Sequence, residues 1–237
     1  MLQGPSAARF VIFASVEHEA LGAFVVERSA PGLTVGEKVG ALALDAAGLA
    51  PLTLDQVKVP AEQRLMGGTP KIQELFVRAA LRGAARMVGG ARTAYQTALS
   101  YAQTRTTFGK PIGHHQAVGF LLADMATAVD SMRWLVWNAA AAIDEKQPDA
   151  LLQACKAVAE VQETGMWLTN QAVQVHGGAG FIQDLPLEKW MREAKAVMSF
   201  GLTPQSADAI SADIMLGRTD LPLSDLLPAA AIQPVLL

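Results

Sequence analysis

The chain has 237 residues, of which 51% are apolar, 17% are charged and only 6% are aromatic. Its net charge is −3 and it contains no basic block, which argues against nucleic-acid binding. No run of about eighteen uncharged apolar residues predicts a transmembrane helix, and the N-terminal segment does not read as a secretory signal. Cys155 is the only cysteine, so an intrachain disulfide is excluded and a cytoplasmic location is expected.

Residues 1–65 have the composition of β-structure. Arg9–Ala14 and Gly22–Val26 are rich in β-branched and aromatic residues, as strands are. Leu52–Val59 alternates apolar and polar residues, which predicts a half-buried strand. We therefore expect part of a β-domain in this region.

From residue 66 onward the spacing of apolar residues predicts helices. Thr69 and Pro70 are typical of an N-cap and a first helical turn, and the first helix should run to about Arg105. Its core face is predicted to follow a stripe of small residues that lets a neighbouring helix approach closely. That stripe includes Ala79, Gly83, Met87, Gly90 and Ala94.

Further helices are expected over about 115–144, 148–176 and 204–216, with a shorter one beginning near Pro186. Long helices joined by short loops are typical of an antiparallel bundle. The sequence thus predicts a mainly α fold. Its parts are a partial β-domain over 1–65, an antiparallel four-helix bundle over 66–217 and an extended tail over 218–237.

Few residues by themselves suggest a catalytic, metal-binding or phosphate-binding site. The four histidines, His18, His114, His115 and His176, do not have metal-ligand spacing, so no metal site is expected. The glycines of 177–180 follow a helix rather than a strand, which favours a helix C-cap over a phosphate-binding loop.

Two further side chains, Cys155 and Arg105, can be interpreted from their positions in the sequence. Cys155 lies among apolar neighbours on a predicted helix, as a buried structural thiol would. Arg105 stands between a helix end and the loop Thr106–Gly109. Its guanidinium could hold a phosphate or bond the last carbonyls of its own helix, and both possibilities stay open.

Two long segments resemble the acyl-CoA dehydrogenase family. Tyr101–Ile112 reads YAQTRTTFGKPI and is followed by Gln116 and by LADM at Leu122–Met125. Gln174–Phe181 reads QVHGGAGF and is followed by PLEKWMR at Pro186–Arg192. Their order and spacing resemble those of the family.

The resemblance covers residues 8–217, and Pro31–Val35 and Val57–Pro60 are similar to the end of the family's middle β-domain. It implies a C-terminal bundle that assembles into oligomers, FAD bound across a subunit interface, and an acyl-CoA substrate. The residues that it assigns to the cofactor are Arg105, Thr107, Phe108, Gln116, Gln174, Val175, His176, Gly177, Gly178, Thr203 and Gln205.

Within this set the resemblance implies different contacts. Arg105 and Thr107 would hold the pyrophosphate of a flavin bound mainly by a neighbouring chain, with Phe108 and Gln116 near that flavin. The segment 174–178 would contact its adenosine end. Thr203 and Gln205 match other flavin-contacting positions of the family.

The sequence departs from the family where substrate reacts. Most members carry a Glu that removes the proton α to the thioester, and Gly201 occupies that position here. Other members carry the base on the first bundle helix, where this chain has Ala79. Val77 and Ala80 replace an Asp and an Arg that help to place substrate. No catalytic residue is therefore predicted in this chain.

Three interpretations remain. In the first, the chain is a subunit that pairs with a complete acyl-CoA dehydrogenase and finishes its FAD site. In the second, it is a non-enzymatic scaffold whose bundle only self-associates. In the third, it is a fragment of a complete dehydrogenase, because the family's N-terminal helical domain and first β-strands have no counterpart in it.

Overall fold

The computed structural model describes all residues except 2, 17–18, 66–67, 200 and 219–237. It divides into two compact units, and the division falls between Phe76 and Val77, inside a helix. The predicted tail lies outside the described residues except for Arg218.

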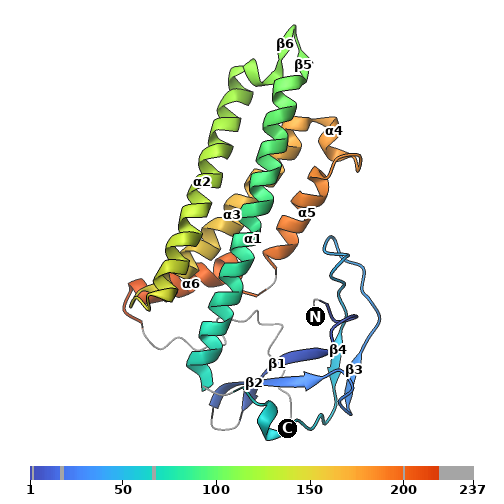
Figure 1. The fold of residues 1–237 in the computed structure, drawn as a ribbon, viewed down its shortest axis with the longest axis vertical. Helices are drawn as coiled ribbons and strands as arrows, with labels where there is room; N and C mark the ends of the chain where they lie inside the picture. Colours follow the sequence, from blue (N-terminus) through green and yellow to red (C-terminus); the bar gives the residue numbers. More distant parts are fainter. Residues whose placement is uncertain (2, 17–18, 66–67, 200, 219–237) are drawn as a thin grey trace. The chain divides into compact units, whose positions relative to one another are not determined.

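The first unit contains two small antiparallel sheets (Figure 1). Strand β1 (Arg9–Val16) pairs with β2 (Glu19–Glu27), and Phe10, Ala23 and Val26 are buried. Strand β3 (Leu33–Val35) pairs with β4 (Leu52–Leu54), which the 3₁₀ turn η1 (Ala61–Gln63) follows. The predicted strands over 9–14 and 22–26 are confirmed.

The third predicted strand is shorter than expected. It ends at Leu54, because Gln56 has a φ of 50° and leaves the extended conformation. The bend passes close to Gly32, whose φ is 86°. A Cβ there would lie 2.0 Å from the Asp55 carbonyl oxygen, so only glycine fits at this position.

The second unit is helical, and the prediction of a mainly α fold is confirmed. The structure has a helix in each region where the sequence predicts one. The helices are α1 (Gly68–Thr104), α2 (Gln116–Asp144), α3 (Ala150–His176), α5 (Leu187–Val197) and α6 (Pro204–Met215). The sequence did not predict the single turn α4 (Gly178–Phe181) or the 3₁₀ turn η2 (Ile112–His114).

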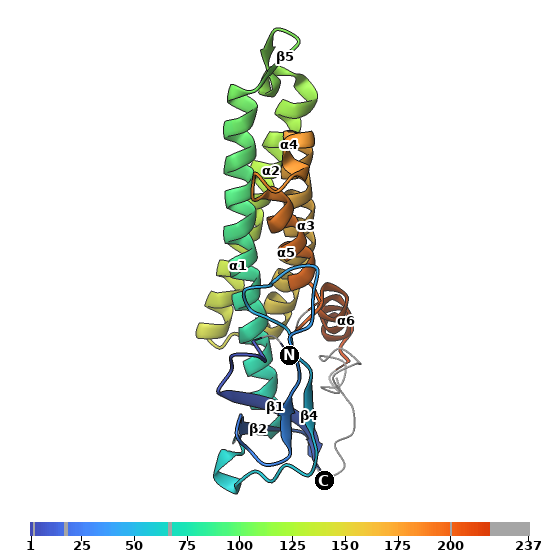
Figure 2. The same ribbon diagram turned by 90° about the vertical axis from the view of Figure 1, so that its right-hand side faces the viewer.

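Helix α3 is the centre of this unit (Figures 1 and 2). It packs against α2, α5 and α6, and side chains on most of its circumference are buried. Helix α1 approaches it where Met87 lies over Gly165. A Cβ on Gly165 would be 2.4 Å from Cγ of Met87, so a larger residue would fit only if the Met87 side chain shifted.

The core face of α1 differs in part from the prediction. Met87 and Ala94 are buried as expected, but Ala79 and Gly90 are exposed. Ala84 and Ala91 are fully buried instead. Small residues occur on both sides of this helix, so its sequence gives little contrast between the core face and the solvent face.

Cys155 is fully buried on α3, and burial raises the pKa of its thiol to about 12. The prediction of a buried structural thiol is therefore confirmed. Among the described residues, no helix combines the length and the apolarity that crossing a bilayer requires.

Candidate cofactor-binding site

The connection between α1 and α2 is a tight hairpin at one end of the helical unit (Figure 1). Strand β5 (Thr106–Thr107) pairs with β6 (Lys110–Pro111), which leaves a loop of only two residues. In that loop φ is 51° at Phe108 and 81° at Gly109. Positive φ at both loop positions matches the twist of a two-residue hairpin, so the backbone fixes the direction of the loop.

The side chains of this hairpin point into solvent. Phe108 is 95% exposed, and Arg105 is exposed as well. The Arg105 carbonyl accepts a hydrogen bond from the Ile112 amide at 2.8 Å, which closes the hairpin at its base. Among the described residues, the Arg105 guanidinium forms neither an ion pair nor a hydrogen bond to its own helix.

The start of α2 lies against the same loop. Nε2 of His115 lies 3.3 Å from the Thr107 carbonyl oxygen, and its ring meets the Phe108 ring edge-on at 6.1 Å. Gln116 is the first, exposed residue of α2. The structure therefore gathers Arg105, Thr107, Phe108 and Gln116, and we refer to these four residues as the hairpin end.

The C-terminus of α3 presents open backbone. Gly177 has a φ of 58°, and its amide donates to the Gln174 carbonyl at 3.1 Å, so the predicted glycine C-cap is confirmed. Gly177 and Gly178 are exposed, and a Cβ at either position would meet nothing within 4 Å. A ligand could therefore approach this backbone closely.

The side chains just before these glycines point inward. Val175 and His176 are buried, whereas Gln174 is exposed. The His176 ring stacks on Tyr101 of α1 with ring centroids 4.2 Å apart. Both rings line a groove of about 470 Å³ between α1 and the chain that follows α3.

Two of the expected residues, Thr203 and Gln205, lie elsewhere in the helical unit. Thr203 caps α6, since its Oγ1 accepts a hydrogen bond from the Ser206 amide at 3.2 Å, and Gln205 is exposed. Figure 1 shows α6 toward the opposite end of the unit from the hairpin. We refer to Gly201, Thr203 and Gln205 as the α6 end.

The α6 end is fixed to the core by Gln162 of α3. This side chain is buried, and its Nε2 donates to the Leu202 carbonyl at 3.1 Å. Gln162 and His176 are fourteen residues apart on α3, which corresponds to about 21 Å along the helix. The residues that the resemblance assigns to the cofactor thus form two separate groups in one chain.

Gly201 and Ala79, the two positions to which the resemblance assigns the base, carry no titratable side chain. Gly201 is exposed with a φ of 71°, and Ala79 is an exposed alanine on α1. Val77 is buried, with an exposed fraction of 6%. The neighbouring Arg78 faces α2, where it forms an ion pair with Asp144 at 3.7 Å.

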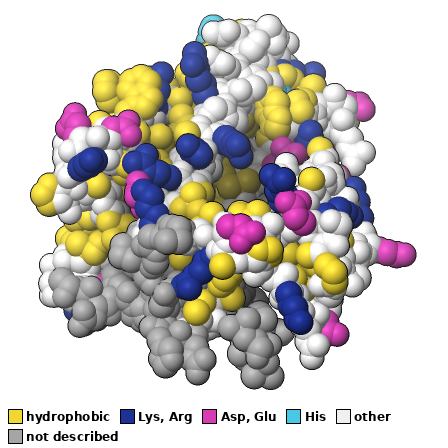
Figure 3. Space-filling view, turned by 60° about the horizontal axis from the view of Figure 1, so that its bottom comes forward, with side chains coloured by type: hydrophobic (Ala, Val, Ile, Leu, Met, Phe, Trp, Pro, Cys, Tyr) yellow, Lys and Arg dark blue, Asp and Glu magenta, His cyan; other side chains and the backbone are white. Residues whose placement is uncertain are grey.

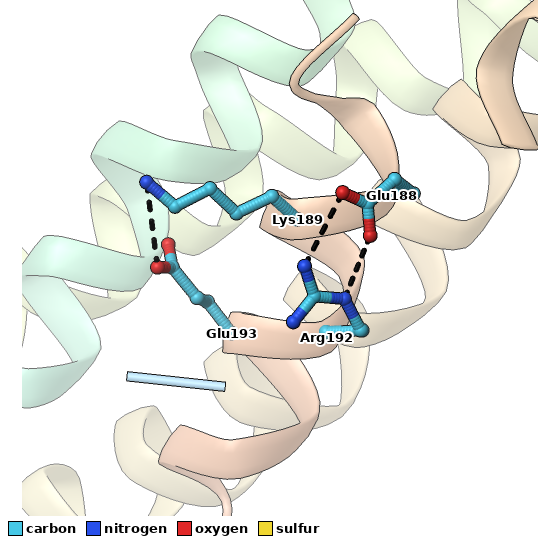
Figure 4. Close-up of polar contacts among 4 residues, drawn as sticks. All are labelled: Glu188, Lys189, Arg192 and Glu193. Carbon is cyan, nitrogen blue, oxygen red and sulfur yellow. Dashed lines mark hydrogen bonds and ion pairs between the residues drawn. The ribbon is translucent and has the colours of Figure 1, made fainter. Parts of the chain in front are cut away.

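The charged residues of α5, for which the sequence indicated no role, pair along the helix (Figure 4). Nε and Nη2 of Arg192 donate to the two carboxylate oxygens of Glu188 at 2.7 and 3.2 Å. These hydrogen bonds hold the pKa of Glu188 below its usual value. Lys189 and Glu193 form a second pair at 3.7 Å. Their spacing of four residues was the signal in the sequence.

Elsewhere the charges are mixed. On the face drawn in Figure 3, Lys and Arg side chains (dark blue) are interspersed with hydrophobic and acidic ones.

Comparison with known proteins gives consistent matches. Residues 66–202 match the family model described as acyl-CoA dehydrogenase, C-terminal domain. The mitochondrial short-chain specific acyl-CoA dehydrogenase of Bos taurus is 33% identical over 198 residues, which are 80% of this chain and 47% of that protein. The chain spans about half the length of the curated relatives that it matches.

Solved structures agree with these matches. Butyryl-CoA dehydrogenase from Megasphaera elsdenii superposes with a TM-score of 0.84 at 29% identity, covering 91% of this chain and 58% of that one. The structure of PigA with FAD and proline superposes with a TM-score of 0.86 at 26% identity, covering 92% of this chain and 58% of that one.

Proposed function

The chain belongs to the acyl-CoA dehydrogenase family, and we propose that it is a subunit of a flavin-dependent acyl-CoA dehydrogenase that contributes FAD contacts across a subunit interface. The observation that carries this proposal is the hairpin end. There the fold presents a cation without an ion-pair partner among the described residues, an exposed aromatic ring and an exposed amide side chain together.

These residues fit a flavin dinucleotide. The Arg105 guanidinium can donate two hydrogen bonds to a pyrophosphate, the Thr107 hydroxyl can add a third, and Phe108 offers an apolar face. The exposed backbone of Gly177 and Gly178 allows close approach of the adenosine end. When bound, FAD supplies the acceptor for the hydride that leaves the acyl chain.

The α,β-dehydrogenation of an acyl-CoA also needs a base for the α-proton, and we propose that another chain supplies it. Glycine at 201 and alanine at 79 carry no titratable group. A carboxylate in an apolar pocket suits this proton transfer, and neither position can provide one. The proposed role is therefore to complete a cofactor site of which the catalytic carboxylate belongs to a complete dehydrogenase subunit.

The test is the flavin content of the full chain, alone and co-expressed with a complete acyl-CoA dehydrogenase. We expect flavin absorbance only in the co-expressed assembly. Arg105→Ala should weaken FAD binding to the apo-assembly about 10- to 100-fold, because hydrogen bonds between charged groups contribute roughly 1.5–3 kcal/mol. Arg86→Ala, which removes the same charge from an exposed position within α1, is the control.

A chain that takes up no flavin with any complete dehydrogenase would contradict the proposal. So would equal FAD affinities of the Arg105→Ala and Arg86→Ala assemblies.

One observation favours a second candidate, a non-enzymatic bundle that only self-associates. Helix α2 exposes three large apolar side chains, Phe120, Trp134 and Trp137, at 63%, 63% and 54%. Exposed aromatic side chains on one helix are typical of association surfaces. If this candidate is right, the purified chain is colourless, forms oligomers alone, and Arg105→Ala leaves the flavin content and activity of a co-expressed dehydrogenase unchanged.

A further inference from the structure

Two stacked rings, the half-buried Tyr101 and the buried His176, join the two chain segments that the proposed function assigns to FAD. Tyr101 lies one helical turn before Arg105. The Tyr101 carbonyl accepts a hydrogen bond from the Arg105 amide at 2.8 Å, in the last turn before the hairpin. His176 lies directly before Gly177. The centroids of the two rings are 4.2 Å apart and their planes meet at 23°. The stack therefore lies where the hairpin end and the C-terminus of α3 approach each other.

The His176 ring is held from both sides. It is only 4% exposed, and its Nδ1 lies 2.8 Å from the Ala172 carbonyl oxygen, one turn earlier on α3. A carbonyl only accepts, so Nδ1 carries the proton and the ring orientation is fixed. Gly180 closes over the same residue, since a Cβ there would lie 2.9 Å from Cβ of His176.

We infer that the Tyr101–His176 stack is a positioning device that sets the distance between the hairpin end and the Gly177–Gly178 backbone, so that both contact one dinucleotide. This inference rests on the proposed function. It gives His176 a role through its neighbours, because its buried side chain bonds its own helix and stacks on Tyr101. Neither ring contacts the cofactor in this assignment.

The test uses the full chain in the assembly with a complete acyl-CoA dehydrogenase, and FAD is titrated into the apo-assembly by quenching of flavin fluorescence. Tyr101→Leu removes the stack and should raise the FAD dissociation constant about ten-fold, the scale of an aromatic pair. Tyr101→Phe keeps the ring and should bind FAD as the parent does. His176→Asn keeps a donor near Nδ1 but removes the ring, and should resemble Tyr101→Leu.

A double-mutant cycle with Arg105→Ala separates positioning from a loss of structure. With Arg105 removed, the strongest contact that the stack positions is gone, so Tyr101→Leu should then change FAD affinity by a clearly smaller factor. Equal effects of Tyr101→Leu with and without Arg105 would overturn the inference, as would normal FAD affinity of Tyr101→Leu. If Tyr101→Leu does not fold, the same comparison with His176→Asn decides.

The two proposals fail differently. If Arg105→Ala binds FAD normally, the proposed function is wrong and the inference fails with it. If Arg105→Ala weakens FAD binding while Tyr101→Leu and His176→Asn do not, only the positioning role is wrong.

Discussion

The hairpin end and the α6 end both carry residues that the resemblance assigns to the cofactor, yet the fold holds them by different means. At the hairpin end, backbone geometry directs exposed side chains, and Phe108 has a left-handed conformation. At the α6 end, Leu202 is buried and Gln162 binds its carbonyl from the core. Substitutions should therefore change ligand binding at the first and folding stability at the second.

The largest expected effect is at Gln162. Gln162→Glu places a carboxylate beside the Leu202 carbonyl in the core and should lower the free energy of unfolding by about 3 kcal/mol at pH 7. Burial raises the pKa of such a carboxyl, so the loss should shrink below about pH 4, where folded and unfolded chains both bind the proton. Urea unfolding at pH 7 and below about pH 4 measures this loss in the free energy of unfolding.

The control is Gln162→Met, which has a similar volume and should lose only about 1 kcal/mol because a single hydrogen bond disappears. If the two variants were equally stable at pH 7, Gln162 would not anchor the α6 end.

The second-largest change in stability is expected from substitutions at Gly201. Its φ of 71° suits glycine, so Gly201→Glu should cost about 1 kcal/mol of stability. Gly201→Asn should cost less, because asparagine tolerates this conformation better. We also expect no acyl-CoA turnover from purified Gly201→Glu chain, because Val77 and Ala80 occupy the positions that the resemblance assigns to substrate placement. Turnover by this variant alone would show that the missing carboxylate is the only defect.

A smaller effect of opposite sign is expected at Phe108. Two-residue hairpin loops with positive φ favour Asn-Gly, so Phe108→Asn should raise the free energy of unfolding by about 0.5 kcal/mol. The same variant should bind FAD more weakly in the assembly, since the exposed ring is lost. Phe120→Asn, on the exposed face of α2, should not stabilise. A destabilised Phe108→Asn would mean that the hairpin end is not under local strain.

The sequence predicted the helices well because proline and glycine residues mark their ends. Pro70, Gly177, Pro186 and Pro204 each stand within two residues of an observed helix boundary. The stacking of Tyr101 on His176 and the burial of Gln162 were not predicted. These contacts depend on how α1 and α6 pack against α3, and a helical pattern gives only the face of each helix.

The separation of the two candidate groups was also invisible in the sequence. The resemblance assigned residues from 105 to 205 to the cofactor, but the distance between the two groups follows from the length of α3 and the turn after α5. Helix α5 is the element that spans this distance between the C-terminus of α3 and the α6 end.

The smallest expected effect is that of breaking the Glu188–Arg192 pair on α5. The Arg192 pair lowers the pKa of Glu188 from its usual 4.5, so its stabilisation is complete above that value and is lost as the pH falls through the lower pKa of the folded chain. Glu188→Gln should therefore lower the melting temperature slightly at pH 7 and leave it unchanged near pH 3. Glu193→Gln, which breaks the longer 3.7 Å pair with Lys189, should have a still smaller effect. If Glu188→Gln also weakened FAD binding at pH 7, α5 would couple the two ends. Unchanged binding would mean that α5 does not couple them.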